Sequence, residues 1–246
     1  MTILVLVGRR VRLALAIAAL SFLAGLLAYA DVFGSPPGPG RQPAPVPPPD
    51  PRYPLAGRLI ALDAGHGGID GGCSAGPWLE KDLALDVVLE VRRLLHAEEA
   101  RVFLTRERDH DLSKLGRGEF RQRRDLHARV NLVRRSGAEL LLSVHLNAAH
   151  SLGLRGPITF FQGASRESER LGRLVQEELL RLYPGCSERA WPNTLYLLRH
   201  SPCPTVLVEI GFLSHPEDRV RLTDPSFRRR VAAALVAALR RYAAGA

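Results

Sequence analysis

The sequence predicts an α/β domain whose central sheet, mostly parallel or mixed, is covered by helices on both faces. From residue 57 onwards, short runs of leucine and β-branched residues alternate with amphipathic segments, which is the pattern of buried strands separated by helices. The chain has 246 residues, of which 46% are hydrophobic, enough for one substantial core. We therefore expect a single folded domain over residues 57–246.

Residues 1–30 have the composition of a signal peptide or membrane anchor. Three arginines between residues 9 and 12 precede an uncharged run over residues 13–30, whose length lies between that of a signal-peptide core and a membrane-spanning helix. The sequence Ala28-Tyr29-Ala30 has the small residues of a cleavage site, whereas arginines before a long apolar run suit an uncleaved anchor. Both alternatives predict export to the outer side of the cytoplasmic membrane, and we favour the anchor.

Proline and glycine dominate the segment that follows, and few apolar residues accompany them. Such a composition forms an extended, semi-rigid spacer rather than part of a core. We therefore expect residues 31–56 to be a linker that holds the domain away from the membrane.

The elements of the domain follow from hydrophobic periodicity. Residues 59–63 form a short apolar run that predicts the first strand, and residues 81–98 predict a helix with an apolar stripe through Leu83, Val87 and Val91. Further strands are expected at 101–105, 140–145, 158–161, 195–199 and 206–210, and further helices at 121–135, 168–182 and 227–242.

Charge and cysteine content argue against two classes of protein. The formal net charge is +9, but the basic residues are spread along predicted helices, without a patch interleaved with aromatic residues, so we expect no nucleic-acid partner. Attraction to an anionic polymer or membrane surface is compatible with this charge. Three cysteines, Cys73, Cys186 and Cys203, are too few for a disulfide framework. Free thiols and a single bridge between Cys186 and Cys203 are the two alternatives.

Three predicted strands lead into a residue suited to metal or proton chemistry. His66 follows the first strand, His145 ends the third, and Glu209 comes near the end of the last. Because the carboxyl ends of strands in an open α/β sheet form the ligand crevice, we expect these side chains to converge. Glu80 is a fourth candidate, since it lies where the glycine-rich turn after His66 enters the first helix.

This combination of residues favours a zinc site of the hydrolytic kind. Two imidazoles and one carboxylate with an open fourth position are typical of catalytic zinc, whereas structural zinc usually has four ligands that include cysteine. The remaining carboxylate can act as a base that takes a proton from water and passes it to a leaving amine. A lone histidine at a strand end is more often structural, but charge beside apolar strands is costly unless it is paired or bound to metal.

Other residues near these positions have less weight as functional candidates. The glycine-rich turn 65–72 lacks the spacing of a dinucleotide fingerprint or a P-loop, so its glycines are better explained by a tight turn that approaches substrate. His150 and Cys73 are spare ligands that a site with two histidines and one glutamate does not require. The remaining histidines are interpreted as surface or structural residues.

Five sequence blocks together resemble the type 3 class of zinc-dependent N-acetylmuramoyl-L-alanine amidases. The blocks occur in the order of that family, and the resemblance covers essentially the whole domain, residues 58–242. They are LDAGHGGIDGG at 62–72, EKD at 80–82, LTR at 104–106, LSVHLNA at 142–148 and VEIGFLS at 208–214.

The resemblance implies a zinc-exopeptidase-like fold and a role for each candidate residue. His66, Glu80 and His145 would bind zinc, and Glu209 would be the general base. The bond cleaved would be the amide between N-acetylmuramic acid and L-alanine in peptidoglycan. Asn147 follows a ligand closely, and contact with substrate, orientation of that ligand and simple packing are its alternative roles.

Two further blocks resemble the germination-specific subfamily of spore-forming bacteria, RERDHDL at 106–112 and DLHARVN at 125–131. That resemblance implies maturation of spore cortex through muramic-δ-lactam formation, a location on the outer side of the cytoplasmic membrane that includes the forespore intermembrane space, and a partner lipoprotein in some lineages. A vegetative cell-wall amidase, another zinc peptidase and an inactive wall-binding domain are the alternatives.

Overall fold

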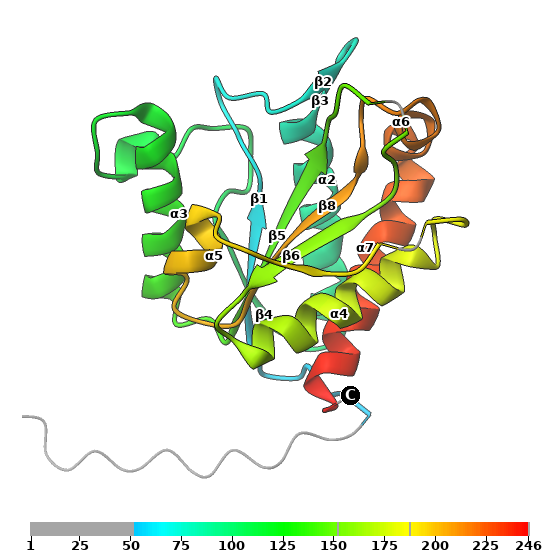
Figure 1. Cartoon of the computed structure of the whole chain (residues 1–246). Coiled ribbons are helices and arrows are strands. Elements are labelled where there is room, and N and C mark those ends of the chain that lie inside the picture. The colour runs from blue at the N-terminus through cyan, green and yellow to red at the C-terminus, as the bar shows by residue number, and fades with distance from the viewer. Residues whose placement is uncertain (1–51, 152, 187, 246) are drawn as a thin grey trace, which may run out of the picture. The chain divides into compact units, whose positions relative to one another are not determined.

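The computed structural model describes residues 52–151, 153–186 and 188–245, and these form a mixed sheet covered by helices (Figure 1). The sheet has six strands in the order β4-β1-β5-β8-β6-β7. Strands β4, β1, β5 and β8 run parallel, whereas β6 is antiparallel to β8 and parallel to β7. The strands are β1 (Leu59–Ala64), β4 (Arg101–Leu104), β5 (Leu140–Asn147), β6 (Ile158–Gln162), β7 (Trp191–Asn193) and β8 (Thr205–Phe212).

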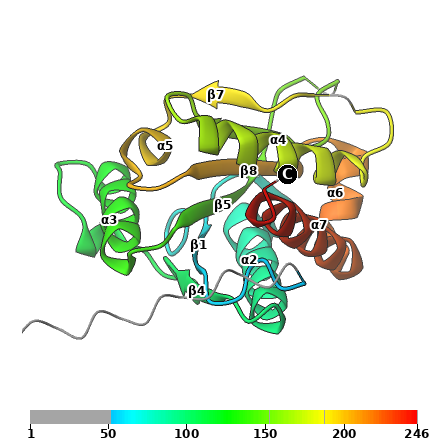
Figure 2. The ribbon, with the colours of Figure 1, turned by 90° about the horizontal axis from the view of Figure 1, so that it is seen from below.

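Helices cover both faces of this sheet, as Figure 2 shows. One face carries α2 (Glu80–Ala97) and α4 (Arg166–Leu180), with α7 (Pro225–Ala243) packed against both. The other face carries α3 (Arg121–Ser136) and the short α5 (Tyr196–His200). The smaller elements are the hairpin β2 (Ser74–Ala75) and β3 (Trp78–Leu79), the 3₁₀ turn η1 (Ser113–Leu115), and α6 (Pro216–Thr223), which contacts β8 and α7.

The two faces bury unequal cores. Side chains alternate between the faces along each strand, so Ile60 and Leu62 of β1 join the large cluster under α2, α4 and α7, whereas Ala61 joins the smaller cluster under α3 and α5. Leu55, which the sequence places in the linker, is fully buried in the large cluster.

Local signals mark several helix ends. The side chain of Ser165 accepts a hydrogen bond from the N–H of Ser168 at the start of α4, and Asp224 does the same for Ser226 at the start of α7, which satisfies N–H groups that have no partner within the helix. Gly137 ends α3 with a φ of 69°, a left-handed conformation that glycine adopts without a steric cost.

The strand predicted at 195–199 is wrong, because these residues form helix α5 instead. The N–H groups of Arg199 and Ser201 donate to the carbonyls of Leu195 and Leu197, as in a helical turn. Periodicity cannot separate a strand from a helix over five residues, and the place beside β6 in the sheet is occupied by β7.

The predicted anchor, residues 1–30, and residues 31–51 of the predicted linker lie outside the described residues. Within the ranges that the structure describes, no helix is long and apolar enough to cross a membrane.

Replacement of Leu142 by alanine should lower the free energy of unfolding by about 2–5 kcal/mol, because the side chain is fully buried in a central strand and its loss leaves a cavity. Urea unfolding followed by circular dichroism measures this change. Leu115→Ala is the matched control, since Leu115 is 61% exposed; equal effects of the two substitutions would contradict the packing described for β5.

Candidate functional site

The candidate residues converge where β1, β5 and β8 end. His145 of β5 lies directly beside Glu209 of β8 in the parallel register, and His66 follows the end of β1. Together with Asp63, Asp70 and residues of α3 and α5, they line a crevice of about 220 Å³. Three strand ends that are far apart in sequence therefore share one concave site.

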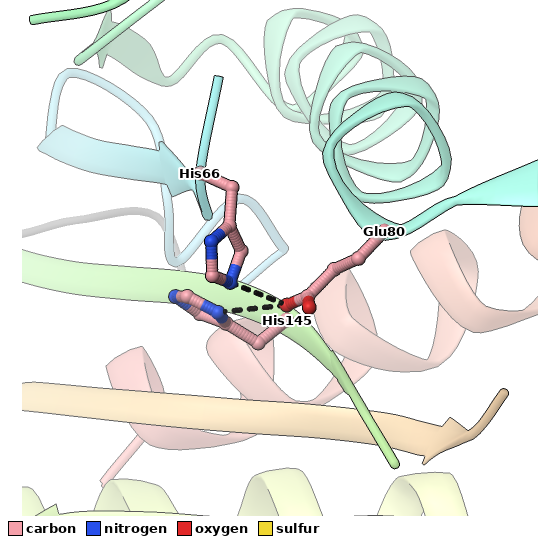
Figure 3. Close-up of side chains that lie close together, drawn as sticks. All are labelled: His66, Glu80 and His145. Carbon is pink, nitrogen blue, oxygen red and sulfur yellow. Dashed lines mark hydrogen bonds and ion pairs between the residues drawn. The ribbon is translucent and has the colours of Figure 1, made fainter. Parts of the chain in front are cut away.

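His66, Glu80 and His145 point toward one another (Figure 3). Oε1 of Glu80 lies 3.1 Å from Nε2 of His66 and 3.0 Å from Nδ1 of His145. The two rings are 5.1 Å apart between centroids and nearly perpendicular. A metal ion needs several histidine, cysteine or acidic side chains whose ligand atoms lie close together. Among the described residues, these three form such a group, with all ligand atoms within 4.8 Å of one another.

The hairpin β2–β3 positions Glu80 beside the two histidines. The N–H of Glu80 donates to the carbonyl of Cys73, and its carboxylate accepts hydrogen bonds from the N–H groups of Cys73 (2.9 Å) and Leu146 (3.1 Å). Burial raises the pKa of Glu80, but the contacts with His145 and His66 outweigh burial and hold that pKa well below its usual range. Glu80 is therefore an ionised carboxylate between two imidazoles.

Two glycines allow the turn after β1 to pack against the site. A Cβ atom at Gly65 would overlap the ring of His145, and a Cβ atom at Gly72 would overlap the carboxyl group of Glu80. Gly72 also has a φ of 68°, which side-chain-bearing residues rarely adopt. These glycines therefore bring the backbone close to His145 and Glu80, whereas the approach to substrate expected from the sequence stays a prediction.

Glu209 has a different environment from Glu80, although both carboxyl groups lie near the two histidines. Its Oε2 is buried and has no hydrogen-bond partner in the described residues. Burial raises the pKa of Glu209 to about 7, and the negative charge of Glu80 contributes in the same direction, whereas the two histidines oppose the shift. The carboxyl group of Glu209 is thus able to exchange a proton near neutral pH.

A buried ion pair supports the site from the α3 side. Arg129 of α3 and Asp63 of β1 are 2% and 0% exposed, and their side chains are 2.6 Å apart. The guanidinium also donates to the carbonyls of Ala64 (2.7 Å) and His66 (2.6 Å) and to the carboxylate of Asp125 (2.6 Å). Arg129 therefore fastens the backbone on both sides of Gly65 to α3.

A second buried arginine holds the same turn from the other side. Arg106 donates to the carbonyls of Ala64 (3.0 Å), Gly65 (2.7 Å) and Lys81 (2.7 Å). The turn that carries His66 is consequently joined to the first turn of α2, which carries Glu80. Both arginines donate to backbone carbonyls of the turn and thereby fix its position.

Three other candidates lie outside the group formed by His66, Glu80 and His145. Asn147 uses its side chain to accept a hydrogen bond from the N–H of Ala148 (2.8 Å), and His150 is exposed. Cys73 places its thiol near the carbonyls of Leu146 and Asn147, and burial together with the charge of Glu80 raises the pKa of that thiol. Cys73, Cys186 and Cys203 are all free.

Sequence reasoning missed Asp63, Arg129 and Asp70 as parts of the site. Nδ1 of His66 lies 3.0 Å from the carboxylate of Asp70, four residues further along the chain. The pair of Asp125 and Arg129 has the spacing of helical neighbours, and an aspartate within an apolar strand was a signal for a buried partner. The pairing of Asp63 with Arg129, however, joins residues 66 positions apart.

Residues 60–241 match the N-acetylmuramoyl-L-alanine amidase family. The germination-specific N-acetylmuramoyl-L-alanine amidase of Bacillus subtilis (strain 168) is 38% identical over 192 residues, which cover 77% of this chain and 81% of that relative. The CwlD amidase of Clostridioides difficile, solved in complex with the GerS lipoprotein, superposes with a TM-score of 0.70 at 32% identity, covering 75% of this chain and 98% of that one. The catalytic domain of CwlV from Bacillus (Paenibacillus) polymyxa var. colistinus gives a TM-score of 0.64 at 25% identity, with 75% and 97% coverage.

Replacement of Arg129 by methionine should destabilise the domain by about 3–5 kcal/mol, because it leaves the carboxylate of Asp63 buried without its partner. Chemical denaturation at pH 7 measures the change. Arg135→Met on the same helix is the control, since Arg135 is exposed. A loss below about 1 kcal/mol in Arg129→Met, comparable to that of an exposed pair, would contradict this role.

The same ion pair predicts how stability depends on pH. Burial raises the pKa of Asp63, but the charge of Arg129 and hydrogen bonds from Ser143 and Thr105 outweigh burial and lower the pKa. The ionised group therefore stabilises the fold above about pH 4, the pKa of an unfolded aspartate, and this contribution is lost as the pH falls further. Urea unfolding between about pH 7 and pH 2 should show a shallower pH dependence for Asp63→Asn than for the unchanged protein. Parallel curves for the two proteins would assign the acid sensitivity to other groups.

Proposed function

The chain belongs to the N-acetylmuramoyl-L-alanine amidase family, and we propose that it hydrolyses the amide between N-acetylmuramic acid and L-alanine of peptidoglycan with the help of zinc. His66, Glu80 and His145 are the proposed ligands, and Glu209 is the proposed general base. The observation that carries this proposal is the approach of two imidazoles and one carboxylate within 4.8 Å beside a second, buried carboxyl group.

The donor set fits zinc in chemistry and in spacing. Imidazole nitrogen and carboxylate oxygen are common zinc ligands, and three protein ligands leave a fourth position open, as catalytic zinc requires. Donor atoms around a tetrahedral zinc lie about 3.3 Å from one another, given zinc–ligand distances of about 2.0–2.1 Å. Oε1 of Glu80 lies 3.1 Å and 3.0 Å from the nearest imidazole nitrogens, and the three donor atoms all lie within 4.8 Å of one another.

The reaction assigns different tasks to the two carboxyl groups. Zinc held by His66, Glu80 and His145 would polarise the amide carbonyl and lower the pKa of its bound water to about 7. Glu209 takes the proton from the attacking water and returns it to the nitrogen of the leaving L-alanine. Glu80 keeps its charge throughout. The hydrogen bonds of Arg129 and Arg106 to the backbone hold His66 and Glu80 in fixed positions relative to each other.

The proposed biological setting is the maturation of spore cortex, with formation of muramic-δ-lactam, on the outer side of the cytoplasmic membrane. Support comes from the relative in Bacillus subtilis, which is named germination-specific and is 38% identical. Residues 1–30 would direct export, and the part of the predicted linker that precedes the buried Leu55 would separate the domain from the membrane. A lipoprotein partner is part of the proposal, because the CwlD amidase of Clostridioides difficile was solved in complex with the lipoprotein GerS.

Replacement of His66 or His145 by alanine should reduce zinc from about one ion per chain to little or none, because each substitution removes one of three ligands. Glu209→Ala should keep zinc but reduce the release of stem peptides from purified peptidoglycan by about 10²–10⁴-fold, since it removes the proton acceptor. Metal analysis and mass spectrometry of peptides with a free N-terminal L-alanine measure the two effects.

Glu217→Ala is the control for this series, because Glu217 is exposed and pairs with Arg155 at the surface. It should keep both zinc and peptide release. Unchanged zinc in either histidine variant would reject that residue as a ligand, and near-normal turnover by Glu209→Ala would reject it as the base.

A further inference from the structure

Both ring nitrogens of His66 have a partner in this structure, and the proposed zinc site explains only one of them. Nε2 lies 3.1 Å from Oε1 of Glu80, whereas Nδ1 lies 3.0 Å from Oδ1 of Asp70. A histidine that binds a metal through one nitrogen usually donates the N–H of the other to a carboxylate or carbonyl. That second hydrogen bond determines the tautomer and the orientation of the ring.

Asp70 is itself held rigidly, which a positioning group requires. Its backbone exchanges two hydrogen bonds with Gly67, of 2.9 Å and 3.2 Å, and its Oδ1 accepts a further one from the N–H of Gly72 at 3.2 Å. Its Oδ2 lies 3.5 Å from the guanidinium of Arg121, at the start of α3. Arg121 also lies 3.4 Å from Asp111, so its side chain is held between two carboxylates.

We propose that Asp70 is a positioning residue that orients His66 for zinc, with Arg121 as its anchor; this inference rests on the zinc site of the proposed function. By accepting the N–H of Nδ1, Asp70 makes Nε2, which faces Glu80, the nitrogen that would give up its proton when zinc binds in the space shared with Glu80 and His145. Because Arg121 holds Oδ2, the carboxylate of Asp70 keeps Oδ1 turned toward His66. Asp70 acts on the metal through His66 alone.

His145 provides an internal comparison for this role. Its Nδ1 faces Glu80, and within the described residues His145 forms no hydrogen bond or ion pair with Asp70. A change at Asp70 should therefore alter the ring of His66 and leave the ring of His145 unaffected.

The test uses the full chain and the variants Asp70→Ala and Asp70→Asn. Competition with a chelator of known affinity gives the zinc dissociation constant, and ¹⁵N NMR of the zinc-bound protein shows which ring nitrogen of each histidine keeps its proton. Asp70→Ala should weaken zinc binding about 10–100-fold and shift His66 away from the tautomer with the proton on Nδ1. Asp70→Asn, whose amide oxygen can still accept, should weaken it less, by about threefold or more.

Asp82→Ala is the matched control, because it removes an exposed carboxylate from the first turn of α2. Within the described residues, this carboxylate forms no hydrogen bond or ion pair with His66 or His145. It should leave the zinc affinity and both tautomers unchanged. Thermal unfolding reports whether each variant folds. If Asp70→Ala does not fold, the zinc affinity of Asp70→Asn tests the inference, since asparagine keeps the shape of the side chain.

The outcomes separate this inference from the proposed function. If the unchanged chain binds zinc and the folded Asp70 variants bind it equally well with the same His66 tautomer, the inference is overturned and the zinc site stands. If the unchanged chain binds no zinc, the proposed function fails and the inference fails with it. A loss of affinity confined to the Asp70 variants, with a changed His66 ring, supports the inference.

Discussion

The site depends on the buried ion pair between Asp63 and Arg129. A carboxylate within a fully buried strand is costly without a partner, and a lone guanidinium beneath α3 would be equally costly. Together they are neutralised, and the remaining N–H groups of Arg129 reach the carbonyls of Ala64 and His66. One interaction therefore joins the sheet, α3 and the turn after β1. Because that turn carries His66 and adjoins the ring of His145, an error in its position would misplace both imidazoles.

Sheet topology explains why four residues from distant parts of the chain meet. Strands β1, β5 and β8 are neighbours and parallel, so their carboxyl ends lie at one edge and His145 and Glu209 become register partners. Alternation along the strands places Asp63, Ser143 and His145 on the face that α3 covers, which gives one polar row within an apolar sheet. Glu80 comes from the opposite face, because α2 begins beyond the end of β1 after the hairpin β2–β3. The crevice is thus assembled from both faces at the point where the sheet ends.

Sequence patterns predicted the features that local periodicity or strand ends encode. The strands at 59–63, 140–145 and 206–210 and the long helices agree with the structure within a few residues, and the family resemblance is confirmed by the match over 60–241. Residues 191–193 and 216–223 were not predicted as elements, because three residues carry no period and α6 is short and strongly charged. Residues 195–199 were predicted as a strand but form a helix, because an apolar run of five residues does not distinguish the two. The partnership of Arg129 with Asp63 depends on the tertiary fold, so no local pattern could reveal it.

The two glutamates show how environment assigns roles that composition leaves open. Chemically identical carboxyl groups lie near the same pair of histidines, yet their pKa values are displaced in opposite directions. Glu80 receives two backbone N–H groups and two imidazoles, all of which favour its charged form. Glu209 has a buried oxygen without a donor, so burial favours its protonated form. A group that keeps its charge suits a ligand, and a group that changes its charge near neutral pH suits proton transfer. The difference arises from the partners of each carboxyl group: Glu80 is in hydrogen-bond contact with both imidazoles, whereas burial is the largest influence on Glu209 and the histidines act on it only through their charge.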